Sequence, residues 1–336
     1  MILPARKDFD MILDDLNKTY GLNFRQYRTH HNEFDLDKFE NEYSSEDIWV
    51  IDHTHEGYFP YDSMEKLHKL FDRLKVNRKK IIYVSADLKI KENYKKWLDT
   101  TNYEPIFVLG IPQWDSLHWF KWNENHEKQI NKIIYNFDQR DKLFLYTNKT
   151  MHSFRQRVFN RVKIQGYLDY SYYSAVEYGK TLDEIKIDDE PFYYNNNLYQ
   201  FYEDSYFEFF VSCDVDESDG RLYMDDKIAK PLIHGHPSIS LSNPNTYRTL
   251  KEMGYEIFEE IFDYSFDVVV DINDRSQIVF DELKRMVKLW EKDKKQVHNL
   301  FMDSLVREKL RYNQNKFLYH NPTFDILRKE LLEVIK

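Results

Sequence analysis

Short apolar runs alternate with amphipathic stretches along this chain, and this alternation limits the folds open to it. Runs of strand length occupy Asp47–Ile51, Lys80–Ser85 and Pro105–Leu109. Between them, Ser63–Leu74 and Glu92–Leu98 carry apolar residues at helical spacing. Strands that alternate with helices predict an α/β fold, with a parallel sheet covered by helices on both faces.

The second half of the chain repeats the alternation. Lys142–Thr147 and Phe207–Ser212 are apolar runs typical of buried strands, and Pro237–Leu241 is a third. A basic helix is predicted over Phe154–Gln165, and another helix is predicted to begin at residues 225–227. The chain therefore contains two sets of strand–helix units.

Length and a polar break predict how these units divide into domains. A chain of 336 residues suggests about two domains of roughly 150 residues each. We place the boundary at the polar stretch Asp138–Asp141, which gives an N-terminal domain over 1–140 and a C-terminal domain over 141–300. Helices over 301–336 are expected to pack back on the N-terminal domain.

Three stretches give weaker predictions of secondary structure. Residues 1–45 are polar with short helical patterns, and 169–197 resembles a polar insertion or loop. Residues 256–267 are rich in Phe and Tyr and suggest a short strand followed by a loop.

Charge and hydropathy exclude several classes of protein. The formal net charge of −10 argues against neutralisation of nucleic-acid phosphates by the whole surface, although a local basic groove stays open. The single cysteine, Cys213, rules out an intrachain disulfide framework. Because no apolar run approaches about 18 residues and the first residues lack a signal-peptide pattern, we expect a cytoplasmic protein without a membrane span.

Two strand–loop–helix junctions could hold a phosphate-bearing ligand. Asn148 and Arg155 flank the turn from one strand into the basic helix. Asp225, Asp226 and Lys227 open the helix that follows the Phe207–Ser212 strand. Helix N-termini bind anions, a carboxylate there can accept ribose hydroxyls, and Lys227 would face a diphosphate. Plain helix capping by Asp225 is the alternative.

A polar group follows the first strand and could supply acid–base chemistry. Asp52, His53, His55 and Glu56 come directly after a buried strand, where α/β folds place ligand sites. The spacing is not that of a zinc site, so a carboxylate base, Glu56 or Asp52, is the favoured interpretation. A capped loop is the alternative.

Aromatic and acidic stretches contain weaker candidates for binding residues. Trp114 and Trp119 could form an acceptor surface, since sugars and bases stack on aromatic rings, or a packed irregular segment. Asp214 and Asp216 form the DxD pattern of metal-dependent glycosyltransferases, but an exposed acidic turn is favoured over a metal site.

Three longer motifs together resemble fucosyltransferase-like glycosyltransferases, a family widespread in phages, giant viruses and bacteria. The motifs are KLFLYTNKTMHSFRQRVFNRVKIQGYLD (142–169), MDDKIAKPLIHGHP with the segment that follows it (224–258), and FDYSFDVVVDINDR (262–275). The matching positions are Asn148, Arg155, Gly166, Leu168, Asp169, Lys227, Lys230, Pro231, Pro237, Leu250, Gly254, Phe258, Ser265, Asp267 and Arg275. Asp225 and Asp226 stand where the family has Thr and Glu, and His152 and Phe154 where it often has Arg and His.

The resemblance implies a GT-B fold, in which two Rossmann-like domains face each other across a cleft. It implies that Asp226 binds the ribose of a nucleotide-sugar, while Lys227 and Arg155 bind its diphosphate, with Asp225 and Lys230 nearby. No metal or other cofactor would be required, because cations and helix dipoles offset the charge of the leaving group. The shorter carboxylate at Asp226 leaves GDP- and UDP-linked sugars open as donors.

The expected reaction is inverting transfer to an acceptor hydroxyl activated by Glu56 or Asp52, with His53, His55, Trp114 and Trp119 as candidate acceptor contacts. A glycan is the default acceptor. A phage-type enzyme could instead glycosylate hydroxymethylated DNA bases flipped into the cleft. A non-catalytic nucleotide-sugar-binding protein is a further alternative.

Overall fold

A computed structural model of the chain describes residues 9–28, 34–54, 61–112, 124–148, 151–175, 198–212, 215, 220–319 and 322–335. The candidates His55, Glu56, Trp114 and Trp119 lie outside these ranges, as does Cys213. Within the described ranges, no helix has the length and apolar character needed to cross a membrane.

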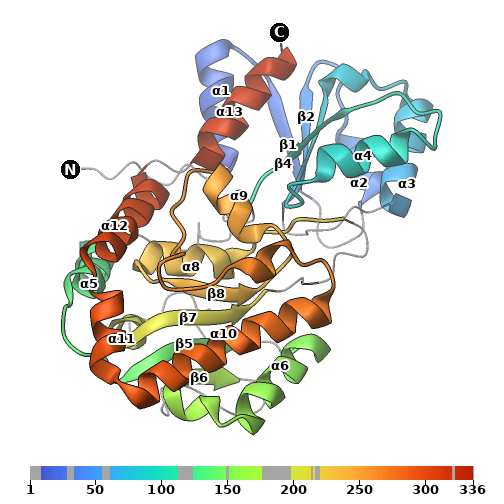
Figure 1. The fold of residues 1–336 in the computed structure, drawn as a ribbon. Helices are drawn as coiled ribbons and strands as arrows, with labels where there is room; N and C mark the ends of the chain where they lie inside the picture. The colour runs from blue at the N-terminus through green and yellow to red at the C-terminus, as the bar shows by residue number, and fades with distance from the viewer. Residues whose placement is uncertain are drawn as a thin grey trace. The chain divides into compact units, whose positions relative to one another are not determined.

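The structure is α/β and contains two compact units, each built on a four-stranded parallel sheet (Figure 1). Unit 1 comprises Met1–His118, Glu217–Asp226 and Asn321–Lys336, and unit 2 comprises Trp119–Asp216 and Lys227–His320. Two parallel sheets with helices between the strands confirm the α/β prediction and are compatible with Rossmann-like domains.

Unit 1 arranges its strands in chain order, β1-β2-β3-β4. Its elements are α1 (Phe9–Tyr20), β1 (Phe24–Arg28), α2 (Leu36–Glu42), β2 (Ile48–His53), α3 (Tyr61–Leu74), the 3-10 helix η1 (Arg78–Lys80), β3 (Ile81–Ser85), α4 (Ile90–Leu98), β4 (Phe107–Gly110) and α13 (Pro322–Ile335). Each strand lies beside the next one in sequence, so the described order contains no reversal.

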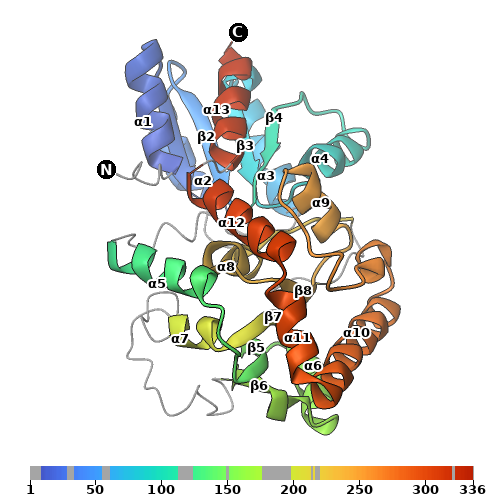
Figure 2. The same cartoon turned by 60° about the vertical axis from the view of Figure 1, so that its left-hand side comes forward.

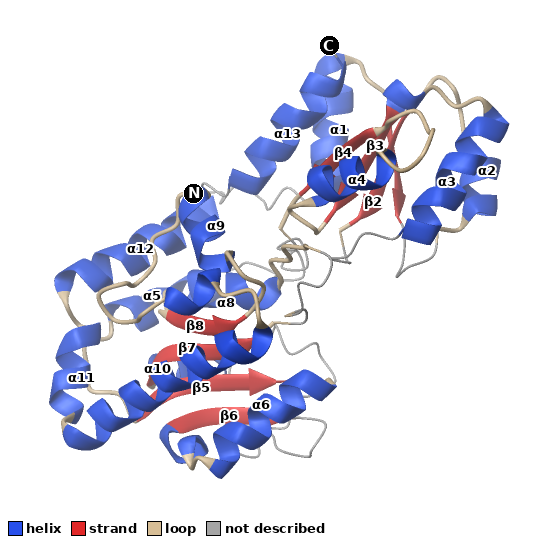
Figure 3. Ribbon diagram, turned by 45° about the vertical axis from the view of Figure 1, so that its right-hand side comes forward, coloured by secondary structure: helices blue, strands red, loops and turns tan. Residues whose placement is uncertain are grey.

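Helices lie on both faces of the unit 1 sheet (Figure 3), and alternate residues of its strands pack against opposite layers. Trp49 and Ile51 belong to a cluster with α2, α3 and α4, whereas Val50 belongs to a cluster with α1 and α13. Parallel strands that are covered on both faces need continuous apolar sequences, which explains why β2 and β3 could be recognised from the sequence.

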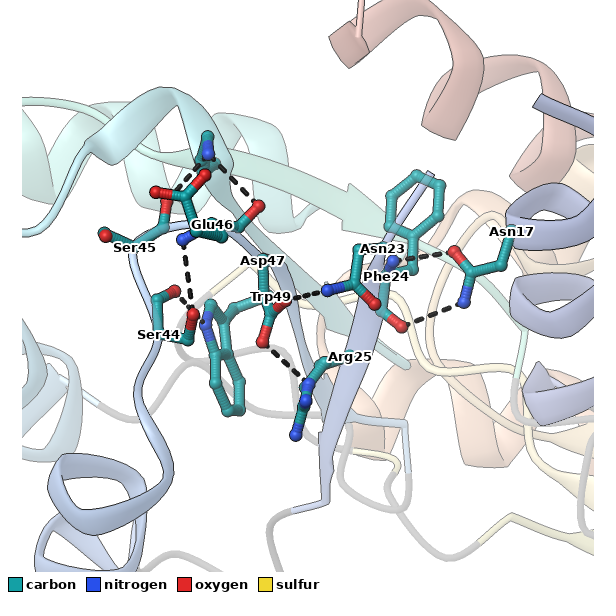
Figure 4. A network of polar contacts seen from close by, with 10 residues as sticks. Asn17, Asn23, Phe24, Arg25, Ser44, Ser45, Glu46, Asp47 and Trp49 are labelled. Atoms are coloured by element: carbon teal, nitrogen blue, oxygen red, sulfur yellow. Dashed lines mark hydrogen bonds and ion pairs between the residues drawn. The ribbon is translucent and has the colours of Figure 1, made fainter. Parts of the chain in front are cut away.

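A polar network holds the edge strand β1 in register (Figure 4). The Asn17 side chain pairs with the Phe24 backbone, donating to its carbonyl at 3.1 Å and accepting from its N–H at 2.7 Å. The buried Asp47 carboxylate lies 2.7 Å from Arg25 Nε and also accepts from the Asn23 amide. The Asn17 contact pairs the Phe24 backbone groups that face away from β2, and the Asp47 contacts tie β1 to the start of its partner strand β2.

A segment from between β7 and α8 completes unit 1. The Asp87 carboxylate accepts hydrogen bonds from the backbone of Lys89 at 2.9 Å and of Leu222 at 3.1 Å, and from the Asn93 amide at 2.8 Å. Asp87 also pairs with Tyr223 in an antiparallel bridge. Residues 222–225 are buried as a result.

Unit 2 arranges its strands in the order β6-β5-β7-β8. Its elements are α5 (Glu124–Tyr135), β5 (Lys142–Asn148), α6 (Ser153–Ile164), η3 (Tyr167–Tyr170), β6 (Ser171–Ala175), α7 (Leu198–Glu203), β7 (Ser205–Val211), α8 (Asp226–His234), β8 (Ser238–Leu241), α9 (Thr246–Glu252), η6 (Ser265–Val268), α10 (Ile272–Lys292), α11 (Lys294–Phe301) and α12 (Ser304–Tyr319). The order reverses at β5, because β6 lies on one side of it and β7 on the other.

Helices cover both faces of this second sheet as well. On one face, Tyr146 of β5 stacks near Phe159 of α6, and Phe209 of β7 meets Phe280 of α10. On the other face, the Tyr202 hydroxyl of α7 donates to the Glu208 carboxylate of β7 at 2.8 Å. Neighbouring residues of β7 therefore point to opposite layers, as a strand requires.

The sequence predictions failed at two of the four edge strands of the described sheets, β1 and β6. Both lie in stretches predicted to be polar, and each pairs with one described strand, β1 with β2 and β6 with β5. Half-exposed edge strands do not need an apolar run, so composition does not reveal them. The strand expected within 256–267 is instead a series of turns followed by η6.

His68 of α3 is buried among aromatic rings in unit 1. Its ring lies within 6.0 Å of the Tyr94 ring, and its Nε2 lies 3.2 Å from the Tyr94 hydroxyl. That hydroxyl already accepts from the Ile106 N–H, so its own hydrogen can be donated to a neutral imidazole. Burial, helped by the Arg78 charge, lowers the pKa of His68 from 6.5 to about 4.

Unfolding should therefore become easier as the pH falls from 6.5 towards 4. In that window the unfolded chain binds a proton at His68 and the folded chain does not, so stability decreases by a total on the order of 3 kcal/mol. Urea denaturation at about pH 7.5 and about pH 4.5 measures the difference. We expect His68→Gln to make this dependence shallower without abolishing it, because burial also lowers the pKa of His236. His152→Gln, at an exposed histidine, should keep the wild-type dependence. Equal slopes in all three proteins would contradict the assignment.

Candidate functional site

The reversal of strand order in unit 2 marks the best candidate site. Ligands of open α/β sheets bind beyond the carboxyl ends of the strands, where neighbouring crossovers run in opposite directions. In unit 2 this point lies between β5 and β7, which are paired in parallel. Asn148 ends β5 and Val211 ends β7, and α6 begins five residues after Asn148. The sequence candidates Asn148 and Arg155 therefore both lie at the switch point.

Asn148 has an unusual environment for a buried amide. The residue is 1% exposed, yet neither its Oδ1 nor its Nδ2 has a hydrogen-bond partner among the described residues. Its backbone N–H donates to the Ser174 hydroxyl at 3.3 Å, which leaves the side chain available. An unsatisfied buried amide costs about 1–3 kcal/mol and requires an explanation.

Tyr146 lies two residues before Asn148 and so on the same face of β5. Burial raises the pKa of the Tyr146 hydroxyl, and the neighbouring Asn148 amide and the Arg155 charge partly offset that effect. The amide is close enough to act on the hydroxyl, although the two groups do not meet hydrogen-bond geometry. The sequence analysis missed Tyr146. The i, i+2 spacing from Asn148 was the signal that could have found it.

Arg155 joins α6 to the end of β7. Its guanidinium is 3% exposed, and its Nε donates to the Val211 carbonyl at 3.1 Å. His152 precedes α6 without a side-chain cap on the helix. The switch point therefore combines a cation, an amide and a helix N-terminus to which the N-cap residue gives no side-chain hydrogen bond.

The predicted helix opening is confirmed at α8, which begins at Asp226. Lys227 is half-buried in its first turn, and Lys230 is buried one turn later. Asp225 is buried in the segment assigned to unit 1, whereas Lys227 belongs to unit 2. The sequence analysis treated residues 225–227 as one donor-binding element. In the structure, this stretch is divided between the two units.

Asp267 and Arg275 serve as structural anchors near the carboxyl edge. The Asp267 carboxylate accepts from the backbone N–H groups of Tyr247 and Arg248, both at 2.9 Å, and so caps α9 from outside the helix. Arg275 donates to the Val215 carbonyl at 2.6 Å and thereby fixes the chain that leaves β7. These contacts position the loops around the switch point.

In unit 1, the candidate residues Asp52 and His53 contact side chains of the neighbouring strands and of the turn after β2. Asp52 accepts from Gln26 Nε2 at 2.7 Å, and from the hydroxyl and backbone N–H of Thr54 at 2.7 and 3.1 Å. His53 Nδ1 lies 2.6 Å from the Tyr83 hydroxyl. The contacts of Asp52 form a turn cap and hold its carboxylate in one orientation.

No group of three or more His, Cys, Asp or Glu side chains that could hold a metal ion occurs in the part of the chain that the structure describes. Asp214 and Asp216 lie outside that part. Comparison with known proteins adds no assignment, because no family model, curated protein or solved structure matches this chain.

Replacing Asn148 tests whether its buried amide lowers the stability of the fold. Because its amide is buried without a partner, Asn148→Leu should raise the free energy of unfolding by about 1 kcal/mol. The control is Asn313→Leu in the same unit, where the amide accepts from Glu256 N–H at 2.8 Å and donates to Glu256 O at 2.7 Å. That variant should lose about 2–3 kcal/mol. Urea denaturation measures the free energy of unfolding of both variants. A loss of stability in Asn148→Leu equal to that in Asn313→Leu would overturn the argument.

Proposed function

We propose that this chain is a glycosyltransferase of the GT-B type, which binds a nucleotide-sugar at the switch point of unit 2. The observation that carries the proposal is the buried, unpartnered Asn148 amide, which acts together with the buried Arg155 on the Tyr146 hydroxyl. The two groups offer donors and an acceptor where an α/β sheet receives its ligand. The two parallel sheets are compatible with the Rossmann-like halves that this class of enzyme needs.

Each donor-binding residue has a role in this proposal. Arg155 and Lys227 would bind the diphosphate, and the α6 N-terminus would add backbone N–H groups. Asp226 would bind the ribose hydroxyls. Lys230, one turn further along α8, would add positive charge. Cations placed around the diphosphate stabilise the charge that develops on the leaving group.

The transfer would proceed by a single displacement. The acceptor hydroxyl oxygen forms a bond to the anomeric carbon as the bond from that carbon to the diphosphate oxygen breaks. The hydroxyl proton passes to a carboxylate, Glu56 or Asp52, and the nucleoside diphosphate leaves. Configuration at the anomeric carbon is inverted. Asp52 would have to release its hydrogen bonds with Thr54 to act as this base, which makes Glu56 the preferred choice.

A glycan is the proposed acceptor. Its recognition would involve His53 and the aromatic candidates His55, Trp114 and Trp119. DNA carrying hydroxymethylated bases is the competing acceptor, favoured by the exposed Arg157 and Lys163 of α6. Salt-dependent retention on duplex DNA would favour DNA, because phosphate contacts weaken as salt rises.

Nucleoside diphosphates should stabilise the protein against heat. At 100 times its Kd, a ligand adds about 2.7 kcal/mol to the free energy of unfolding. We expect one of GDP or UDP to do so and Arg155→Met to abolish the effect. Arg157→Met changes an exposed arginine of the same helix and should keep it. A flat wild-type response to all nucleoside diphosphates would defeat the proposal.

Hydrolysis of the nucleotide-sugar distinguishes an enzyme from a binding protein. The wild type should release nucleoside diphosphate slowly with water as the acceptor, and Lys227→Ala and Glu56→Ala should each reduce that rate. Stabilisation by the diphosphate without any hydrolysis or transfer would identify a non-catalytic nucleotide-sugar-binding protein instead.

A further inference from the structure

A second group of cations lies beyond the opposite edge of the unit 2 sheet, at the amino ends of β5 and β7. Arg140 precedes β5, and Arg307 and Arg311 lie on α12, which runs beside α5 (Figure 2). Arg140 and Arg307 meet at the carboxyl end of α5, because both donate to the Ile133 carbonyl, each at 3.4 Å. This group is separate from the candidate site at Asn148, which lies at the carboxyl ends of the strands.

Arg140 forms four hydrogen bonds to backbone carbonyls, although its Nε, like that of Arg307, is buried without a partner among the described residues. Its Nη1 donates to the carbonyls of Tyr202 at 2.7 Å and Ser205 at 2.9 Å, and also to the Glu203 carbonyl. The Tyr202 and Glu203 carbonyls lie at the carboxyl end of α7, where the helix dipole favours a cation, and Ser205 begins β7. Arg140 therefore has a structural role that needs no ligand.

Arg307 is not satisfied in this way. It is 3% exposed and carries five N–H donors, but its guanidinium forms one hydrogen bond to a described residue, the long contact with Ile133. Its Nε is buried without a partner. A buried guanidinium in such a position costs several kcal/mol unless a counter-charge compensates it.

The charges around Arg307 increase this cost. Burial, together with the charges of Arg140 and Arg311, lowers the pKa of Arg307 to about 10, and no acidic side chain among the described residues acts in the other direction. Two acids, Glu203 and Asp204, act on Arg140, and Glu203 is already paired with Lys132 at 2.7 Å. The partial negative charge at the end of α5, about half an elementary charge, cannot balance three guanidinium groups.

We propose that Arg307, with Arg140 and Arg311, forms a binding site for an oxyanion of the phosphate class at the carboxyl end of α5. The planar fork of an arginine matches the oxygens of such a group, and the Nε of Arg307 supplies an available donor. Phe137 packs against the Arg307 guanidinium at 5.0 Å, and Tyr135 lies 6.0 Å from Arg311, so exposed rings flank the site. The site is independent of the nucleotide-sugar proposal.

Inorganic phosphate is the probe, compared with sodium chloride at equal ionic strength and pH. At ten times its Kd, phosphate should raise the wild-type Tm by roughly 3–6 °C. Arg307→Met retains the apolar stem of the side chain and should remove this rise. Arg248→Met changes an exposed arginine on α9 that is paired with Glu252, and should keep the full rise.

Two further variants locate the bound phosphate. Arg155→Met removes the cation at the switch point and should retain the phosphate effect, which excludes binding at the nucleotide-sugar site. Arg311→Met, at a half-buried residue, should weaken phosphate binding, and it serves as the test if Arg307→Met fails to fold. An equal rise in wild type, Arg307→Met and Arg311→Met, or no rise in the wild type, would overturn the proposal.

Discussion

The burial of parallel strands on both faces is the constraint that governs the rest of this structure. The middle of each inner strand is closed to water, so polar side chains gather where the strands end. There each buried polar group must find a partner inside the protein or receive one from outside. The carboxyl ends of the two sheets, which look alike in sequence, differ in how they meet this requirement.

In unit 1 the buried polar groups at the strand ends have partners inside the protein. The Asp52 carboxylate is held by Gln26 and Thr54, and the Asp87 carboxylate by backbone N–H groups and Asn93. In unit 2 the Asn148 amide at the corresponding position of β5 has no partner among the described residues. The two sheets also differ in topology, because only the unit 2 order reverses within the described strands. Chemistry and topology thus point to the same place for a ligand.

The sequence alone predicts the features that short local patterns of residues encode. The inner strands follow from their apolar runs, and Asn148 and Arg155 follow from their place at a strand–loop–helix junction. The edge strand β6 and the Asp87 anchor could not be found in this way. An edge strand needs no apolar run, and the partner of Asp87 at Leu222 lies 135 residues away in the sequence. Contacts of this range depend on the order of strands, which a single sequence does not reveal.

The contrast between Arg140 and Arg307 shows why burial alone does not identify a ligand site. Both guanidinium groups are buried, and burial lowers the pKa of both to about 10. Arg140 donates to carbonyls at the ends of α7 and α5 and at the start of β7, whereas Arg307 shares one carbonyl with it at 3.4 Å. A protein gains nothing in stability from an arginine held this way, since an apolar side chain of similar volume would fill the space at lower cost. The same reasoning applies to Asn148, and in both places the missing hydrogen bonds point to a group that the folded chain does not itself provide.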